Sequence, residues 1–253
     1  MATIDLNSDL GEGYGDYRMG DDAAMLQIVT SVNVACGFHA GDPQIMAETF
    51  AAARAAGVAI GAHPGYPDLQ GFGRRFIPYS AAEIERLVAY QLGAAMALAS
   101  LARHKVTHVK AHGALANLAA DDREVAGAVV RAAKAVDPGL VILAIAGTEI
   151  ERAADGNGMR AAREIFADRA YTPLGRLVPR TQPGAVIHDP ETAAARVLNM
   201  LKEGAIIAVD GTRVPVGIDS VCVHGDTPGA VALAGAVRAA LTGAGFVLRP
   251  FAS

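Results

Sequence analysis

The segment 220–226 reads SVCVHGD, a short apolar run that ends in histidine, glycine and aspartate. The same kind of ending recurs in three earlier segments, NVACGFHAGD (33–42), VAIGAHPGY (58–66) and VTHVKAHGA (106–114). Each run has the length and composition of a buried strand, and each stops where glycine or proline accompanies a histidine. Because this ending is repeated in a chain with seven histidines, we expect parallel strands whose ends contribute to one functional site.

Strand-like runs alternate with longer helical runs along the whole chain, which predicts an α/β fold with a parallel sheet covered by helices. The helices have recognisable starts, either an N-cap before proline or a capping box. These starts lie at Asp42-Pro43, Asp189-Pro190, Ser80 with Glu83, and Thr148 with Glu151. The expected strands are Thr3–Ser8, Ser31–Cys36, Val58–Ala62, Thr107–Ala111, Leu140–Ala144, Arg163–Ala167, Ala205–Val209 and Val221–His224. Seven or eight strands favour a closed, TIM-like (β/α) barrel in one domain over residues 1–253, with an open doubly wound sheet as the alternative.

Composition narrows the class of protein. The chain has 253 residues, of which 52% are hydrophobic, so it is long enough to bury a sizeable core. Its formal net charge of −4 gives no electrostatic reason to expect nucleic acid or an anionic membrane as partner. The N-terminus has no signal-peptide pattern, and the longest apolar stretch, Leu87–Ala102, is too short to span a bilayer. Cys36 and Cys222 sit inside apolar runs, which favours free thiols and a cytoplasmic location.

In a parallel barrel, catalytic groups lie at the C-terminal ends of the strands, where all four histidine endings fall. Residues two apart share a strand face, so Asp5, Asn7 and Asp9 point to one side of the first strand. Lys110 and His112 share a face in the same way, as do Cys222 and His224. We therefore expect a polar pocket at the barrel mouth, formed by Asp9, His39, His63, Lys110, His112, His224 and Asp226. A lone histidine after a strand is usually an ordinary loop residue, and we expect His104 and His188 to lie outside the pocket.

The polar residues of this pocket each have more than one interpretation. A lysine within a strand must be paired or reach solvent, so Lys110 either binds a substrate carboxylate, acts as a base, or pairs with Asp5 or Asp9. Glu12 lies between glycines after the first strand and is either a general base or a solvated acid on a turn. Asp226 has a free carboxylate if the next residue, Thr227, caps a helix begun at Pro228.

Two long loops carry arginines that suit recognition of a carboxylate or phosphate. The first, GYPDLQGFGRRF (65–76), contains Arg74 and Arg75, and the second, FADRAYTPLGRLVPRTQPGA (166–185), contains Arg180. Motifs for a phosphate-binding loop, a zinc helix or a serine nucleophile are absent from the sequence. A divalent metal stays open as a hypothesis, with Asp9, His39, His63 and His112 as candidate ligands.

These sequence motifs resemble those of the LamB/YcsF family. The resemblance is carried by DLNSDLGEGYG (5–15), NVACGFHAGDP (33–43), GAHPGYPDLQGFGRR (61–75), VKAHGALAN (109–117), FADRAYTPLGRLVPRTQPGAV (166–186) and CVHGD (222–226). It covers nearly the whole chain and departs at Ala111 and Ala116, where the family usually has Pro and Tyr. Lys110 and His112 of that segment are retained.

The resemblance implies a distorted barrel of the glycoside hydrolase/deacetylase type. It also implies a part in ATP-dependent opening of 5-oxo-L-proline to L-glutamate, within a 5-oxoprolinase that contains two other subunits, B and C. ATP is implied by the resemblance alone, so nucleotide binding or activation is expected to depend on the partners. Two alternatives stay open: a stand-alone metal-dependent deacetylase or amidohydrolase, and a non-catalytic subunit that completes a partner's site.

The roles expected of the individual residues follow from lactam hydrolysis, which needs a base for water and a proton for the leaving nitrogen. His112 and His224 are expected to do this work, with Asp9 and Asp226 orienting them. The full set of candidate catalytic residues is Asp9, Glu12, His112, His224 and Asp226. The candidate substrate-binding residues are Asn7, His39, His63, Arg74, Arg75, Lys110 and Arg180.

Overall fold

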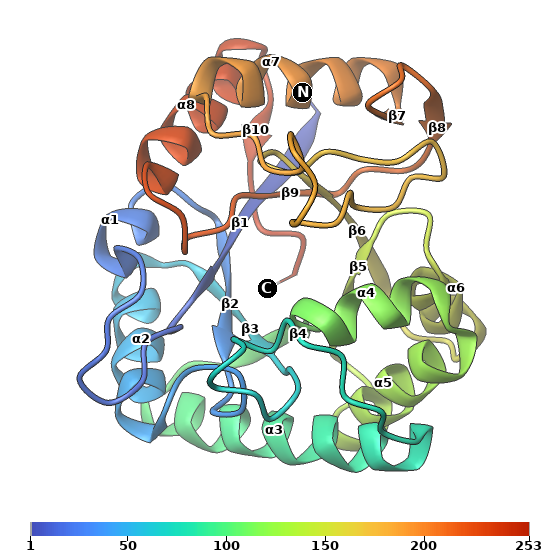
Figure 1. Cartoon of the computed structure of the whole chain (residues 1–253). Helices are drawn as coiled ribbons and strands as arrows, with labels where there is room; N and C mark the ends of the chain where they lie inside the picture. Colours follow the sequence, from blue (N-terminus) through green and yellow to red (C-terminus); the bar gives the residue numbers. More distant parts are fainter. Residues whose placement is uncertain (1, 253) are drawn as a thin grey trace.

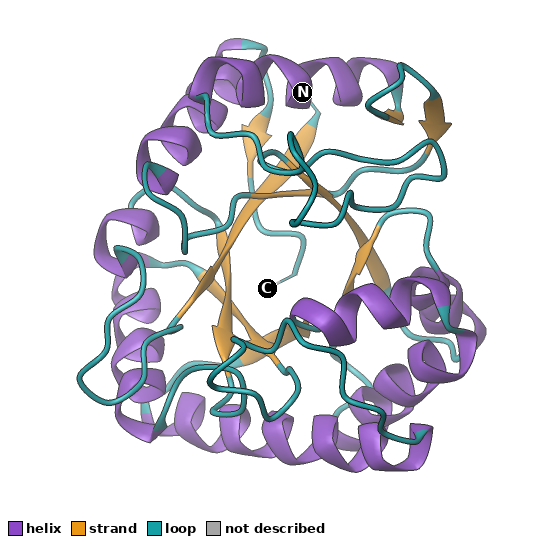
Figure 2. Cartoon of the chain, viewed as in Figure 1, coloured by secondary structure: helices purple, strands orange, loops and turns teal. Residues whose placement is uncertain are grey.

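Parallel strands close into a barrel, and helices form a ring around it (Figures 1 and 2). The computed structural model describes residues 2–252. The barrel strands are β1 (Thr3–Leu10), β2 (Ser31–Ala35), β3 (Ala59–His63), β4 (Val106–Val109), β5 (Val141–Ile145), β6 (Ala161–Phe166) and β9 (Ser220–Cys222). They pair in that order, and β9 pairs back onto β1 with Leu6 opposite Val221. The closed barrel predicted from the sequence is thus confirmed, with seven strands.

One expected strand does not belong to the barrel. The run Ala205–Val209 gives only the three-residue β7 (Ala205–Ile207), which pairs antiparallel with β8 (Arg213–Pro215). A turn between them, closed by the bond from the Gly211 N–H to the Ala208 carbonyl, folds the chain back at once. The prediction of an eighth parallel barrel strand there is wrong, because the adjacent strand β8 forms the backbone hydrogen bonds that β7 would need to pair within the barrel.

The helices are α1 (Asp22–Leu26), α2 (Pro43–Ala56), α3 (Ala81–Leu101), α4 (Gly113–Asp121), α5 (Arg123–Val136), α6 (Glu149–Gly156), α7 (Pro190–Glu203) and α8 (Ala230–Gly243). Asp42 and Asp189 cap α2 and α7 with their side chains, and Ser80 forms a complete capping box with Glu83, as predicted. The box predicted at Thr148 is wrong: its hydroxyl donates to the Ile145 carbonyl, and Glu151 accepts from the Gly147 N–H.

Strand β1 shows how the barrel is built from an alternating sequence. Ile4, Leu6 and Leu10 join the apolar layer between strands and helices. Asp5 and Asn7 point into the barrel, where side chains of β2, of β9 and of Thr30, the residue before β2, satisfy them. The interior is therefore a stack of hydrogen-bonded polar groups rather than an apolar plug.

The C-terminal segment closes the floor of the barrel. Strand β10 (Val247–Leu248) pairs with the beginning of β1, and Phe251 then packs with its ring 4.8 Å from that of His108. Figure 1 shows the segment that follows β10 in the centre of the ring of strands. With the floor covered, the opposite end of the barrel is left for the long loops after the strands. Within residues 2–252, no helix has both the length and the apolar character that crossing a membrane requires.

Candidate active site

A cavity of about 460 Å³ opens at the C-terminal end of the barrel strands. Its titratable lining residues come from β1 and β3, from helix α4, and from the segments that follow several of the barrel strands. They are Asp9, Glu12, His63, Arg74, Lys110, His112, Asp121, Arg169, Arg176, Arg180 and His224. This is the end at which parallel barrels carry their catalytic groups, and the polar pocket expected from the sequence is present there.

Three imidazoles meet beside this cavity. The ring of His39 stacks on that of His112 with centroids 3.6 Å apart, and His63 meets both rings edge-on. His63 Nε2 lies 3.0 Å from His112 Nδ1. The loop after β3 holds this cluster in place, because the Phe72 carbonyl accepts a hydrogen bond from His112 Nε2 at 2.8 Å. Gly73 makes the approach possible, since a Cβ there would lie 2.7 Å from His39 Cβ.

Glu12 lies against the same cluster. Its Oε1 atom is 3.4 Å from His39 Nε2 and 3.6 Å from His112 Nδ1, and burial raises the pKa of this carboxyl well above its ordinary value. The expectation of a solvated acid on a turn is wrong, because only 7% of the residue is exposed. Glu12, His39, His63 and His112 bring their ligand atoms within 4.8 Å of one another, and such a group of donors is able to hold a metal ion.

Lys110 lies at the centre of a buried ion network. Its ammonium is 2.9 Å from Asp9 Oδ1, 2.9 Å from Glu164 Oε2 and 3.1 Å from Cys222 Sγ. Burial alone would lower the pKa of Lys110, but Asp9, Cys222 and Glu164 outweigh burial and raise that pKa well above its ordinary value. Lys110 is therefore a fixed cation rather than a base. The ion pair that the sequence left open is present with Asp9 and absent with Asp5, whose carboxylate accepts from Thr30, Ser31 and Ser220 instead.

His224 and Asp168 form a second acid–base unit. His224 Nδ1 lies 2.8 Å from Asp168 Oδ2, and the Phe166 ring stacks on the imidazole with centroids 5.2 Å apart. Burial by itself would raise the pKa of Asp168, but His224 outweighs it and holds that pKa below its ordinary value. The carboxylate fixes Nδ1 as the donor, which leaves Nε2 of an imidazole lining the cavity free to accept a proton.

The arginines differ in how far they are available to a ligand. Arg74 donates to Asp226 at 2.6 Å, and Arg176 donates to Asp121. Arg180 lines the cavity, and among residues 2–252 it has no hydrogen-bonded or ion-paired acid. Burial, followed by repulsion from Arg74, lowers the pKa of Arg180. An unpaired, partly buried guanidinium at a cavity wall is a suitable site for an anionic group.

Several predicted site residues lie elsewhere than expected. Asn7 and His39 are buried behind the cavity rather than in its wall, and Arg75 is paired with Asp68 on the outer side of the loop. Asp226 does not orient His224, because it pairs with Arg74, and α8 begins at Ala230 rather than at Pro228.

The pairing of histidines with carboxylates also differs from expectation. Asp9 contacts His63, at 3.4 Å, rather than His112. The predicted convergence holds for His63, His112 and His224, which line one cavity, with His39 stacked behind them. His104 lies outside it as expected, bonded to the Val58 carbonyl at the start of β3, and His188 is not a lining residue either.

Sequence reasoning missed Glu164 and the role of Asp168 as the partner of His224. Glu164 is a charged residue inside an apolar strand, which is the same signal that singled out Lys110. Glu164 and Asp168 each stand two residues from Phe166, which lines the cavity, so period-two alternation places them on the inner side. Asn33 and His108, which hydrogen-bond at 3.0 Å within the barrel, were missed as well and support the network from below.

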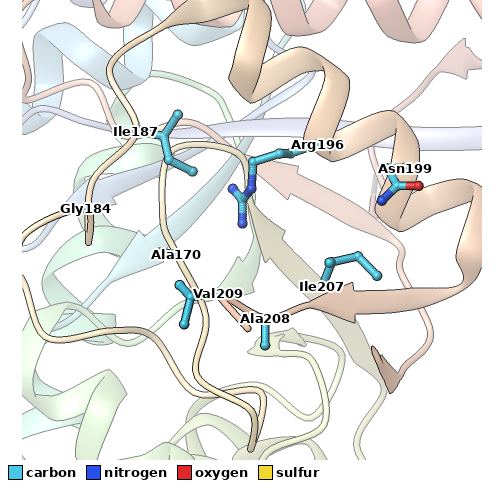
Figure 3. A pocket seen from close by; sticks show the side chains of 8 residues that line it. All are labelled: Ala170, Gly184, Ile187, Arg196, Asn199, Ile207, Ala208 and Val209. Atoms are coloured by element: carbon cyan, nitrogen blue, oxygen red, sulfur yellow. The ribbon is translucent and has the colours of Figure 1, made fainter. Parts of the chain in front are cut away.

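A second cavity, of about 300 Å³, lies away from the barrel mouth between α7, β7 and the loop before α7 (Figure 3). Its polar side chains are those of Arg196 and Asn199, and the other lining residues are apolar or glycine. Arg196 donates to the Arg169 carbonyl at 3.3 Å. No carboxylate or imidazole of residues 2–252 lines this cavity, so it lacks the acid–base groups found at the mouth.

Comparison with known proteins places the chain clearly. The model of the LamB/YcsF family matches residues 4–253. A protein of Rhodopseudomonas palustris, named as the A subunit of 5-oxoprolinase, is 56% identical over 253 residues, which cover 100% of this chain and 99% of that protein. A Gluconobacter oxydans protein of the same name is 56% identical over 98% of this chain and 97% of its own length.

Solved structures agree with this placement. The lactam utilization protein of Thermus thermophilus superposes with a TM-score of 0.92 at 46% identity, covering 98% of this chain and 100% of that one. A putative cellobiose-phosphate cleavage protein of Enterococcus faecalis has a TM-score of 0.57 at 14% identity, covering 98% of this chain and 96% of that one, and it shares the fold alone.

Proposed function

Because the chain belongs to the LamB/YcsF family, we propose that it forms part of a 5-oxoprolinase and helps to open 5-oxoproline to L-glutamate with ATP hydrolysis. The observation that carries the proposal is identity of 56% over nearly the full length to proteins named as the A subunit of that enzyme. The mouth cavity supports it independently, since it combines acid–base groups with cations suited to a small anionic lactam. A stand-alone deacetylase has no comparable support, because none of the relatives of high identity reported above is named as a deacetylase.

The substrate carboxylate binds Arg180 in this proposal. Lys110 is already neutralised by Asp9 and Glu164, and Arg75 lies outside the cavity, so neither is free to receive it. Arg74 stands at the same wall but is paired with Asp226, so it is less available than Arg180. A hydrogen-bonded charged contact of this kind contributes about 1.5–3 kcal/mol, which corresponds to a roughly 10- to 150-fold effect on binding.

His224 is the base that activates water. Asp168 keeps its Nδ1 protonated, so Nε2 faces the cavity with a lone pair. The water attacks the lactam carbonyl and gives its proton to His224, and the His224 imidazolium then returns that proton to the ring nitrogen as the C–N bond breaks.

Two partner subunits supply the nucleotide step in this proposal, because the chain has no phosphate-binding loop motif. The test mixes the purified chain with its partners and measures glutamate released from 5-oxoproline with and without ATP. We expect negligible release by the chain alone and ATP-dependent release by the mixture. Robust ATP-dependent release by the isolated chain would contradict the division of work between subunits.

The role of Arg180 in binding the substrate carboxylate is tested in the same assay with Arg180→Ala. We expect KM to rise about 10- to 150-fold with a smaller change in kcat, as for a group that binds ground and transition states alike. The matched control is Arg152→Ala, which removes an exposed arginine paired with Glu149 on α6. Equal KM values in the two variants would remove Arg180 from the binding site.

A further inference from the structure

Two nitrogens of the histidine cluster, one from His63 and one from His112, face each other, and the hydrogen bonds of the two rings leave neither of them with an N–H. His63 Nδ1 is 2.8 Å from the Lys110 carbonyl, and His112 Nε2 is 2.8 Å from the Phe72 carbonyl. A carbonyl oxygen only accepts, so both of these nitrogens carry the proton of a neutral imidazole. The other two nitrogens, His63 Nε2 and His112 Nδ1, therefore point lone pairs at each other across 3.0 Å. Such an arrangement requires a positive centre between or beside them.

Glu12 adds a carboxyl group to the same point. Its Oε1 atom is 3.6 Å from His112 Nδ1, and among residues 2–252 its short polar contacts are with imidazoles only. No lysine or arginine lies within ion-pair distance of it in that range, unlike Asp9, which Lys110 neutralises at 2.9 Å. An ionised carboxyl that is buried without a cationic partner is costly, so a cation bound at this point would stabilise Glu12 as a carboxylate.

From these contacts we infer that His63 Nε2, His112 Nδ1 and Glu12 Oε1 bind a divalent transition-metal ion of the Zn²⁺ class. Two nitrogens and one carboxylate oxygen are ligands that zinc accepts, with a fourth position open toward the cavity. Bonds of about 2.0–2.2 Å in a tetrahedron put ligand atoms roughly 3.3–3.5 Å apart. The observed separations of 3.0 and 3.6 Å bracket that range.

The proposed histidine ligands also make the hydrogen bonds, from the ring nitrogen that does not bind the metal, that are typical of metal sites. A histidine that ligates a metal commonly donates its other N–H to a backbone carbonyl, and both His63 and His112 do so. His39 stacks in parallel on His112, with an interplanar angle of 2°, so both rings cannot direct in-plane lone pairs at one ion. We assign His39 to holding His112 in position. This inference rests on the contacts alone and does not depend on lactam chemistry.

The other group of donors, Asp9, Cys222 and His224, does not call for a cation. The Lys110 ammonium already lies 2.9 Å from Asp9 and 3.1 Å from Cys222, and it occupies the place an ion would take. A second cation beside it would be repelled. The inference is therefore specific to the site formed by His63, His112 and Glu12.

The experiment uses the full chain, freed of any purification tag and dialysed against a chelator. Zn²⁺ is titrated by calorimetry, and Co²⁺ is titrated by visible absorption, which reports the coordination geometry. We expect one equivalent of each metal per chain and a tetrahedral Co²⁺ spectrum. Glu12→Gln keeps the side-chain volume and should weaken binding about 100-fold or more, as should His63→Ala, whereas the control His188→Ala should bind like the wild type.

Binding of less than one equivalent, or binding that Glu12→Gln leaves unchanged, would overturn the inference. In that case a shared proton on the His63–His112 pair would be the remaining positive centre. Circular dichroism of each variant establishes that it folds, and Glu12→Gln serves if His63→Ala does not. Because metal content is read without substrate, failure here leaves the proposed lactam-opening function untouched.

Discussion

Replacing Lys110 with methionine tests whether the ion network at the centre of the barrel is as buried as the structure indicates. Methionine keeps most of the side-chain length but removes the ammonium that bridges Asp9 and Glu164, both at 2.9 Å. The exposed fractions of the three side chains are 6%, 4% and 0%, so water cannot replace the lost partner easily.

The expected loss follows from leaving two carboxylates without their common cation. Removing one partner of a buried ion pair destabilises a protein by about 3–5 kcal/mol, and here one ammonium serves two acids. We therefore expect the free energy of unfolding to fall by about 4–5 kcal/mol in Lys110→Met. Adding Glu164→Gln removes one of the orphaned charges, and about 1–3 kcal/mol should return in the double variant.

Urea unfolding followed by circular dichroism measures these differences, with an unchanged m value as the check on two-state behaviour. The wild type, both single variants and the double variant form a cycle that isolates the coupling between the two side chains. A loss below about 1 kcal/mol in Lys110→Met would show that the network contributes little stability. Additive effects of the two substitutions would likewise refute the ion pairing with Glu164.

Three further predictions concern other parts of the barrel. Asp168→Asn should lower kcat in the reconstituted complex by about 10²-fold or more with little change in KM, because His224 loses the carboxylate that fixes its tautomer. An unchanged kcat would exclude His224 as the base. Burial raises the pKa of Asp5 from 3.8 to about 6, so the acid form is favoured on folding and stability falls as pH rises from 3.8 to 6. The unfolding free energy of wild type relative to Asp5→Asn should then drop by about 3 kcal/mol between about pH 3 and pH 7.5, and a flat difference would contradict the raised value. Gly73 has a φ of 62°, and Gly73→Ala would add a Cβ 2.7 Å from the His39 side chain. The substitution should lower the free energy of unfolding, measured by thermal unfolding, by about 2–4 kcal/mol. Gly57→Ala at φ 69°, with nothing within 4 Å of its Cβ, is the control and should lose only the backbone part of that amount.

Much of the fold was predictable because its signals are local. Alternation in β1 separates Asp5, Asn7 and Asp9 from Ile4 and Leu6 without reference to any other strand. Aspartate before proline marks the starts of α2 and α7, since capping depends on neighbours three residues away. The same locality explains one error, because a strand-like run at 205–209 cannot reveal that the adjacent residues 213–215 pair with it.

The sequence by itself therefore determined the barrel, the end of it that carries the polar residues, and most of the residues that gather there. Which acid meets which base was decided only by the tertiary structure. Asp168 rather than Asp226 meets His224 across 56 positions, and Glu164 meets Lys110 from a strand two places further around the barrel. Such contacts depend on the relative register of strands and on the path of loops, and a shift of one residue would turn each side chain to the opposite face.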